Sequence, residues 1–183
     1  MSTKYRFSDN EIPHFVTLSL VEWIDLFSRE RYKEIIIDNL NHCIKNKGLI
    51  VYAYVIMPNH MHMIVKSGGI QSLAELIRDF KRYTAKILYE RLKSDHKESR
   101  RGWLMRIIEE EAQKSSSNKK FKVWRHESHP VVLETNAMIE DRLHYIHNNP
   151  VRSGICFSAA DYKYSSACQY SGEIGPLALS FMD

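Results

Sequence analysis

The stretch YVIMPNHMHMIVKS, Tyr54–Ser67, places two histidines one residue apart inside an otherwise apolar run. A Pro-Asn pair lies in the middle of the stretch, so the pattern predicts a hairpin of two strands. The nearly continuous apolar character indicates that these strands are central in their sheet and covered on at least one face. Because side chains alternate along a strand, His60 and His62 point to one face and the methionine between them to the other.

Sequence patterns on either side of the hairpin predict further helices and strands. Apolar residues recur at helical spacing in some segments, and β-branched and aromatic residues gather in others. The polar run KSDHKESRR, residues 93–101, is expected to be solvated. The expected elements are a strand over Pro13–Trp23, a helix from a Ser28 cap to Gly48, the hairpin strands, a helix over Ser72–Leu92, a shorter helix over Gly102–Gln113, an interrupted strand region over Phe121–Leu133, and a helix from Thr135 or Asn136 to Asn149 that Pro150 stops.

This order of strand, helix, hairpin, helix, strand and helix predicts an α+β fold, in which helices pack on one or both faces of an antiparallel sheet. The 183 residues suffice for one domain with a full core and are few for two. We therefore expect a single domain over residues 1–183, with an insertion around 93–120 and a polar-aromatic C-terminal tail.

Composition and charge narrow the class of protein. The net charge of +4 is a mild basic excess, but basic residues cluster with aromatic ones in FKRYTAK and SSSNKKFKVWR, which favours nucleic acid as a partner. The three cysteines form no C-x-x-C pair, so the pattern indicates neither a zinc knuckle nor a disulfide framework. No stretch has the apolar length of a signal peptide or a membrane span. We expect a cytoplasmic, nucleoid-associated protein with no membrane partner.

A second unusual motif, YIHNNPVRSG, begins at Tyr145 in the last expected helix. Tyr145 and Asn149 are one helical turn apart and share a face with Arg142, at the edge of the buried stripe. His144 and His147 fall on the opposite side, which we expect to be solvated. Taken alone, a tyrosine at this position is more often a packing aromatic than a nucleophile.

The two motifs together are more specific than either one. Two imidazoles at alternate strand positions present nitrogens to one point, which suits a divalent metal, although an isolated H-x-H is more often a hydrogen-bonded pair on a sheet face. MPNHMHMIV followed about eighty residues later by YIHNNPVRSG resembles the single-tyrosine HUH transposases, the IS200-like transposases, and most closely the REP-associated tyrosine transposases. FKRYTAKIL, VWRHESHPVVL and DYKYSSACQYSG resemble that family in order and spacing, so the resemblance covers nearly the whole chain.

The resemblance implies a ferredoxin-like antiparallel sheet with the His-x-His motif on its central strand. It implies that His60, His62 and Asn149 bind Mg²⁺ or Mn²⁺, with asparagine in place of the glutamine usual in insertion-sequence members, as in the REP-associated branch. Tyr145 would attack a phosphodiester of single-stranded or hairpin DNA, leaving a free 3′-hydroxyl and a 5′-phosphotyrosine link that a later 3′-hydroxyl can reverse. The metal would stabilise the charge of the scissile phosphate. No general base is identifiable from the sequence.

The basic clusters supply the expected DNA contacts, which would make affinity depend on salt. Exposed aromatic residues could stack on unpaired bases, and Trp124, Tyr83 and Tyr170 are the candidates. The predicted DNA-binding residues are Lys81, Arg82, Lys86, Lys120, Lys122, Arg125 and Arg152.

Other functions remain open at this point. A domesticated, non-catalytic protein that recognises palindromic repeats is the main alternative, although a mere binder does not need both histidines, the tyrosine and the asparagine. A plasmid relaxase or rolling-circle initiator ranks third, because those proteins usually carry the nucleophile in a different arrangement and often in a longer chain. A metal-dependent hydrolase ranks fourth, because no carboxylate accompanies the histidines in the hairpin.

The resemblance also bears on assembly. Insertion-sequence relatives work as dimers that can exchange the tyrosine helix between subunits, whereas some REP-associated members act as monomers. We favour a homodimer, in which Tyr145 would complete the site of its own chain or of the partner.

Overall fold

The computed structural model describes residues 11–114 and 120–182. Residues 115–119 of the predicted insertion lie outside this range. Four antiparallel strands form one sheet in the order β2-β3-β1-β4, as the ferredoxin-like expectation requires. The strands are β1 (His14–Ser19), β2 (Leu49–Ile56), β3 (His60–Ser67) and β4 (Val131–Val132).

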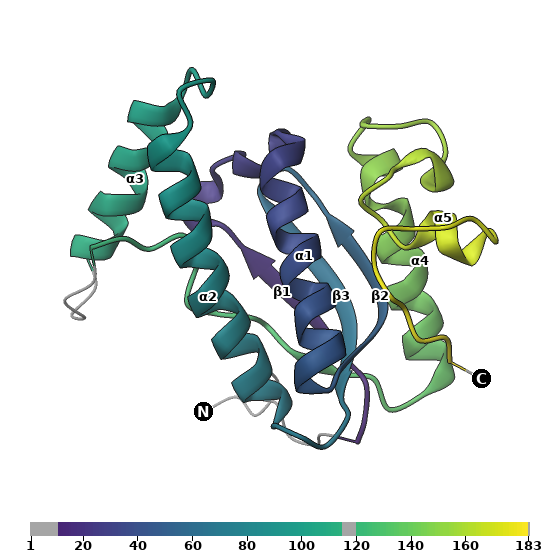
Figure 1. Ribbon diagram of the computed structural model, residues 1–183. Coiled ribbons are helices and arrows are strands. Elements are labelled where there is room, and N and C mark those ends of the chain that lie inside the picture. The colour runs from purple at the N-terminus through teal and green to yellow at the C-terminus, as the bar shows by residue number, and fades with distance from the viewer. Residues whose placement is uncertain (1–10, 115–119, 183) are drawn as a thin grey trace.

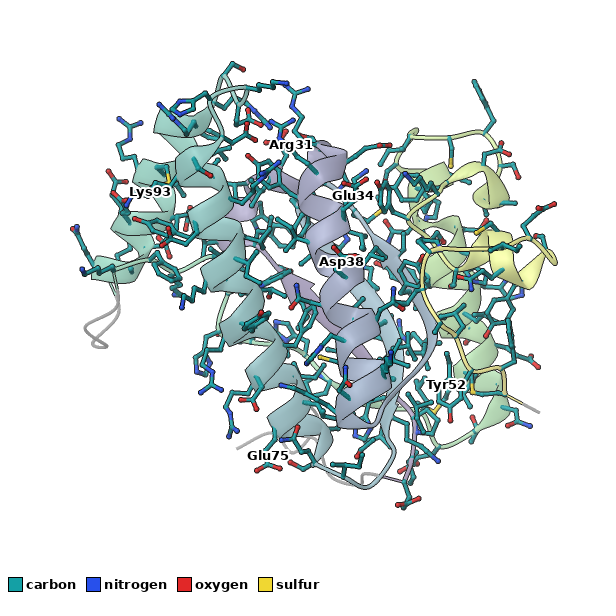
Figure 2. All side chains as sticks on the ribbon, in the orientation of Figure 1. Arg31, Glu34, Asp38, Tyr52, Glu75 and Lys93 are labelled. Carbon is teal, nitrogen blue, oxygen red and sulfur yellow. The ribbon has the colours of Figure 1, made fainter. Side chains whose placement is uncertain are left out.

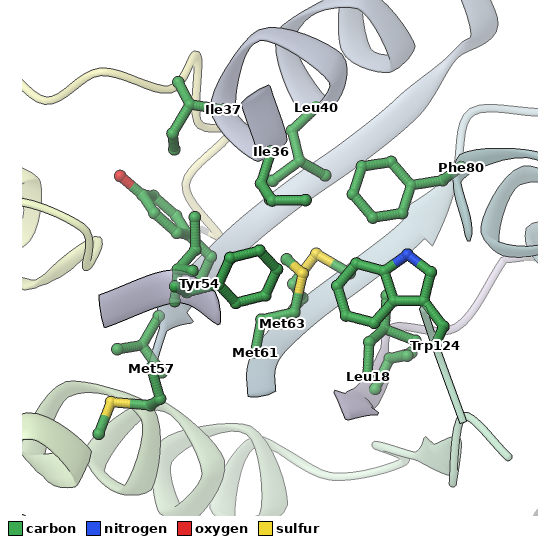
Figure 3. Close-up of a cluster of buried hydrophobic side chains, with 14 of the residues drawn as sticks. Leu18, Ile36, Ile37, Leu40, Tyr54, Met57, Met61, Met63, Phe80 and Trp124 are labelled. Carbon is green, nitrogen blue, oxygen red and sulfur yellow. The ribbon is translucent and has the colours of Figure 1, made fainter. Parts of the chain in front are cut away.

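Helices cover both faces of the sheet (Figure 1). Helices α1 and α2 pack side by side over one face, with α3 beside α2, whereas α4 packs against β2 and β3 from the other side (Figures 1 and 3). The α-helices are α1 (Glu30–Lys47), α2 (Leu73–Ser94), α3 (Arg101–Gln113), α4 (Asn136–Arg152) and α5 (Ala167–Tyr170), and short 3-10 turns lie at Val21–Trp23, Leu26–Ser28 and Ala159–Asp161. None of the helices in the described part of the chain has the length and apolar character of a membrane span.

The central hairpin has the predicted form. The turn is tight, because the N–H of Met57 donates to the carbonyl of His60 (2.8 Å). Met61 and Met63 are fully buried beneath α1, and Figure 3 shows them below Ile36. The alternation of β3 therefore sends the two histidines to the opposite face, where α4 lies.

The predicted strand region before the last helix forms a regular strand only at its C-terminal end, in β4. Its other contacts with β1 are single hydrogen bonds, from the N–H of Thr17 to the carbonyl of Ser128 (3.1 Å) and from the N–H of Arg125 to the carbonyl of Ser19 (2.9 Å). Trp124 forms an isolated bridge with Leu20, and β4 pairs with the start of β1. Between them the chain leaves strand geometry near His129, which has a positive φ of 39° and precedes a proline. The expected interruption is thus confirmed, and it leaves β4 very short.

Two predicted helix boundaries differ from the structure. Arg29, not Ser28, is the residue before α1, and it makes no side-chain cap. Helix α4 continues past Pro150 to Arg152. A proline inside a helix removes one backbone hydrogen bond, but here only the last turn follows it, so little helix remains to be broken.

The loop between α2 and α3, expected to be solvated, contains buried carboxylates. Asp95 pairs with Arg31, which lies near the start of α1 (Figure 2), and accepts a hydrogen bond from Tyr32 (2.9 Å). The Glu98 side chain is fully buried and pairs with three arginines. The polar run is therefore an ion-pair network that ties α1 to the α2–α3 loop. Local sequence could not reveal it, because the α1 partners are distant in sequence.

The C-terminal tail runs along β2 rather than away from the domain. The N–H of Ile56 donates to Tyr164, and the N–H of Ser166 donates to Tyr54 (both 2.9 Å). His147 of α4, expected to be solvated, is half-buried, and its Nε2 shares a 2.9 Å hydrogen bond with Ser166 Oγ. That expectation was wrong because this segment covers the outer side of α4.

Glu98→Gln should destabilise the protein at neutral pH. Burial alone would raise the pKa of Glu98, but hydrogen bonds and charge from the arginines lower it below its usual 4.5. Such a carboxylate contributes stability above its unfolded pKa and loses it as the pH falls through the lower folded pKa. We expect the variant to lose about 2 kcal/mol of unfolding free energy at pH 7.

Urea denaturation at pH 7 and in acid measures this loss. The difference from the wild type should shrink as the pH falls below the unfolded pKa of Glu98 and through its lower folded pKa, because the wild-type carboxyl is then also protonated. The control is Glu110→Gln on the surface of α3, where the carboxylate lies 3.9 Å from Arg106 and is well exposed. An equal effect of both variants, or a difference that persists in acid, would contradict the network's role.

Candidate active site

The two histidines of β3 lie together on the α4 side of the sheet. Their ring centroids are 4.7 Å apart, and the planes are inclined at 72°. His62 lies opposite Thr17 of β1 in the strand register, and His60 is the first residue after the hairpin turn. The pair therefore lies on the two adjacent central strands of the sheet, β3 and β1.

Hydrogen bonds orient both imidazole rings. His60 Nδ1 donates to the side-chain oxygen of Asn59 (2.6 Å); an amide oxygen only accepts, so Nδ1 carries the proton and Nε2 keeps its lone pair. His62 Nδ1 shares a 2.9 Å hydrogen bond with the Thr17 hydroxyl. When Nδ1 of His62 is the donor, both histidines present an unprotonated Nε2, which is the form that a metal ligand needs.

Burial keeps the two imidazoles neutral. It lowers the pKa of His60 to about 4 and that of His62 to about 3, and for His62 the charges of His60 and Arg142 add to the effect. At neutral pH neither ring is protonated on both nitrogens. The pair is thus in the form that coordinates a cation.

Tyr145 of α4 reaches the histidine pair from within the same chain. Its hydroxyl lies 3.5 Å from His62 Nε2, at the outer limit of a hydrogen bond, and the two ring centroids are 5.1 Å apart. The β3 strand and the α4 helix therefore bring together two residues that are 83 positions apart in sequence. A phenol, two neutral imidazoles and an adjacent arginine form a site suited to nucleophilic attack on an anionic group.

The donor set fits a hard divalent cation. Among the described residues no group of three or more histidine, cysteine and carboxylate side chains could hold a metal. A metal bound to the two imidazoles would therefore need an oxygen ligand from another kind of side chain. Asn149 lies one turn beyond Tyr145 on α4 and is only 9% exposed. Its role as a ligand stays a prediction. Two imidazoles and an amide oxygen would suit Mg²⁺ or Mn²⁺ better than an all-nitrogen set.

Two further residues of the site were not predicted from the sequence. Phe15 of β1 stacks on His62 at 5.2 Å between centroids and meets Tyr145 edge-on at 5.9 Å. The guanidinium of Arg142 lies 5.0 Å from the centre of the Phe15 ring. Arg142 shares the face of Tyr145 on the helix, and this spacing could have indicated it. The position of Phe15 depends on the register of β1 and could not have been predicted locally.

The predicted DNA-binding residues are spread over several surfaces. Lys81 donates to the carbonyls of Arg125 and His126 (both 2.8 Å), so its ammonium holds the loop after Trp124. Burial lowers the pKa of Lys81 to about 8. Arg82 pairs with Asp79 (3.2 Å). Their DNA contacts stay a prediction.

The other predicted DNA-contact residues are either half-buried or exposed. The structure does not gather them around the histidines, with the exception of Arg125, whose guanidinium lies 5.6 Å from the ring centre of Trp23. Lys122 is half-buried near Glu111 (3.9 Å). Lys86, Lys120, Arg125 and Arg152 are exposed on α2, after α3, beside β1 and at the end of α4.

Of the aromatic residues expected to stack on bases, Trp124 is excluded. It is buried, and its indole N–H donates to the hydroxyl of Thr84 (3.0 Å). Tyr83 is exposed on α2, and the Tyr170 hydroxyl donates to the carbonyl of Tyr52 (3.0 Å). For these two tyrosines base stacking stays a prediction.

Comparison with known proteins identifies the class as a transposase. The family described as "Transposase IS200 like" matches residues 14–106, which are more than half of the 183 residues. The chain therefore belongs to the IS200-like transposase family, as the sequence motifs predicted. The matched range contains both histidines, whereas α4 with Tyr145 lies beyond it.

Two solved structures resemble the chain, and the first of them supports the fold. The REP-associated tyrosine transposase bound to a REP hairpin has a TM-score of 0.65 at 16% identity, over 100% of this chain and 94% of that one. A candidate transposase from Deinococcus radiodurans R1 has a TM-score of 0.48 at 13% identity, over 80% of this chain and 97% of that one. No curated protein matches. The first likeness establishes the ferredoxin-like transposase fold.

Thr17→Val should weaken Mn²⁺ binding while leaving the fold intact. Valine has the shape of threonine but cannot hold His62 Nδ1, so the ring loses its orientation; loss of such an outer partner typically weakens metal binding about tenfold or more. Titration of Mn²⁺, with free ion measured by electron paramagnetic resonance, gives the affinity directly.

The matched control is Thr84→Val, which removes a buried threonine hydroxyl bonded to Trp124 and away from the histidines. This variant should keep the wild-type Mn²⁺ affinity. If Thr17→Val also kept it, the threonine would have no part in orienting a metal ligand.

Proposed function

We propose that this transposase nicks and rejoins single-stranded or hairpin DNA through a covalent 5′-phosphotyrosine at Tyr145. The observation that carries the proposal is the 3.5 Å separation between the Tyr145 hydroxyl and His62 Nε2. It supports a shared reaction centre, since a tyrosine that only packs would not need its hydroxyl at a pair of neutral imidazoles.

The chemistry follows from the groups at hand. The phenol oxygen of Tyr145 forms a bond to phosphorus, the bond from phosphorus to the 3′ oxygen breaks, and the phenolic proton ends on the released 3′-hydroxyl. Attack by a 3′-hydroxyl reverses the step and joins DNA ends, because the phosphotyrosine retains the ester bond. Mg²⁺ or Mn²⁺ held by His60, His62 and Asn149 would polarise the scissile phosphate.

The remaining residues of the site would position the DNA. Arg142 lies beside Phe15 at 5.0 Å and near enough to His62 to lower its pKa, so it offers a fixed positive charge to a phosphate oxygen. The solved relative that resembles this fold is bound to a REP hairpin, which supports hairpin DNA as the substrate class. The family resemblance implies that this substrate is an imperfect palindrome that folds as a hairpin.

Tyr145→Phe and His60→Ala should each abolish a covalent protein–DNA adduct. Labelled single-stranded oligonucleotides from the palindromes that flank the gene are mixed with protein and Mn²⁺ and resolved on a denaturing gel. The first variant lacks the nucleophile and the second lacks a metal ligand. Tyr83→Phe, an exposed tyrosine on α2, is the control and should form the adduct normally.

The outcomes separate the competing functions. Tight binding without any adduct, across many hairpins and in either metal, would indicate a domesticated DNA-binding protein. An adduct that survives Tyr145→Phe would show that another residue is the nucleophile.

Arg142→Gln should slow adduct formation by about 100-fold, as expected for the loss of one donor that stabilises the charge of the transition state. Arg142→Lys keeps the charge without the planar guanidinium and should recover part of the rate. Single-turnover rates at saturating DNA measure the chemical step. Arg106→Gln, an exposed arginine of α3, is the control, and equal slowing in that variant would exclude a local role for Arg142.

A further inference from the structure

An exposed tryptophan lies at the edge of the histidine pair. Trp23 leaves 52% of its surface exposed, and its indole meets the His60 ring edge-on, with 6.0 Å between centroids. A solvent-exposed indole is uncommon in a folded domain, because an exposed tryptophan forgoes the large favourable free energy of burying its apolar surface. Its place beside the proposed reaction centre needs an explanation.

The backbone that presents this indole is strained. Glu22 and Trp23 have consecutive positive φ angles of 47° and 52°, a conformation that non-glycine residues adopt only at a cost in energy and that is a true outlier for bulky side chains. Such outliers persist where the surroundings enforce them, and they gather at functional sites.

The surroundings that enforce the strain are tied to the histidine hairpin. Val21 and Ile24, on either side of the strained pair, are buried, and the N–H of Val21 donates to Val123 (2.9 Å). The N–H of Leu20 donates to the carbonyl of Asn59 (2.9 Å), the residue whose side chain holds His60. Trp23 is therefore fixed relative to His60 by the same residue that orients that imidazole.

A positive charge completes the platform. The Arg125 guanidinium lies 5.6 Å from the centre of the Trp23 ring. Its backbone is held in place twice, because its N–H donates to Ser19 (2.9 Å) and its carbonyl accepts from Lys81 (2.8 Å). An indole beside a guanidinium offers both a stacking surface and a phosphate contact, the combination that binds single-stranded nucleic acid.

We propose that Trp23, with Arg125, forms a stacking platform for one unpaired base of the DNA strand, adjacent to the phosphate at the histidine pair. This inference rests on the proposed function. It assigns a binding subsite to residues other than the predicted stacking residues Tyr83 and Tyr170.

Equilibrium binding tests the platform separately from catalysis. A fluorescent hairpin oligonucleotide with a single-stranded arm is titrated by anisotropy, with every variant made in the Tyr145→Phe background so that no adduct forms. Trp23→Asn removes the ring but suits a positive φ, so it should be as stable as its parent. It should bind about tenfold more weakly, while Trp23→Phe keeps most of the affinity.

The matched control is Trp103→Ala on α3, a tryptophan that is 45% exposed and has no contact with the histidines. It should bind as its parent does. An abasic nucleotide moved along the single-stranded arm locates the stacked base, because at that position the abasic penalty should be present with Trp23 and absent with Trp23→Asn.

Two results would overturn the platform while leaving the proposed function in place. One is wild-type adduct formation combined with unchanged binding by Trp23→Asn. The other is that Trp23→Asn loses as much affinity for a hairpin with a fully duplex arm as for one with a single-stranded arm, because a paired base cannot stack on the indole. Absence of both binding and adduct in the wild-type protein would instead reject the proposed function, and the platform with it.

Discussion

The register that pairs Thr17 with His62 is the constraint on which the site depends. A slip of one residue would turn both histidines towards α1 and bring Met61 to the α4 side. The core resists that slip, because the methionines of β3 are fully buried under α1 and an imidazole in their place would lie among apolar side chains without a partner. Core packing and the geometry of the site are therefore set by one pairing, and neither can change alone.

Features determined by local sequence were predictable. The alternation of β3 placed both histidines on one face, and helical spacing placed Tyr145 and Asn149 one turn apart. Clear end signals marked some helix ends, such as the start of α2 at Ser72, where a capping box with Glu75 forms, and the end of α1 at Gly48, which has a positive φ. The motifs also indicated the correct family, because they belong to the part of the chain where chemistry restricts the choice of residues.

Features determined by distant partners were not predictable. Trp124 has the same local character as an exposed stacking residue, but Thr84 and the core above the sheet bury it. Asp95 belongs to a run that looks like a solvated loop, and its partner Arg31 lies on another helix. Trp23 depends on a left-handed turn that no glycine marks. In each case burial or exposure follows from tertiary contacts that local patterns do not encode.

The C-terminal segment has a consequence for the order of events in DNA. Ser166 bonds both to Tyr54 of β2 and to His147 of α4, so the helix that carries the tyrosine is anchored to its own sheet beyond its end as well as before its start. A molecule whose site is completed by its own α4 has one phenol, that of Tyr145, for the proposed attack. In the proposed reaction it can hold one DNA end at a time, so a second cut must follow resolution of the first or be made by another molecule. In the proposed reaction, anchoring of the helix would therefore impose a sequence in time on cutting and joining.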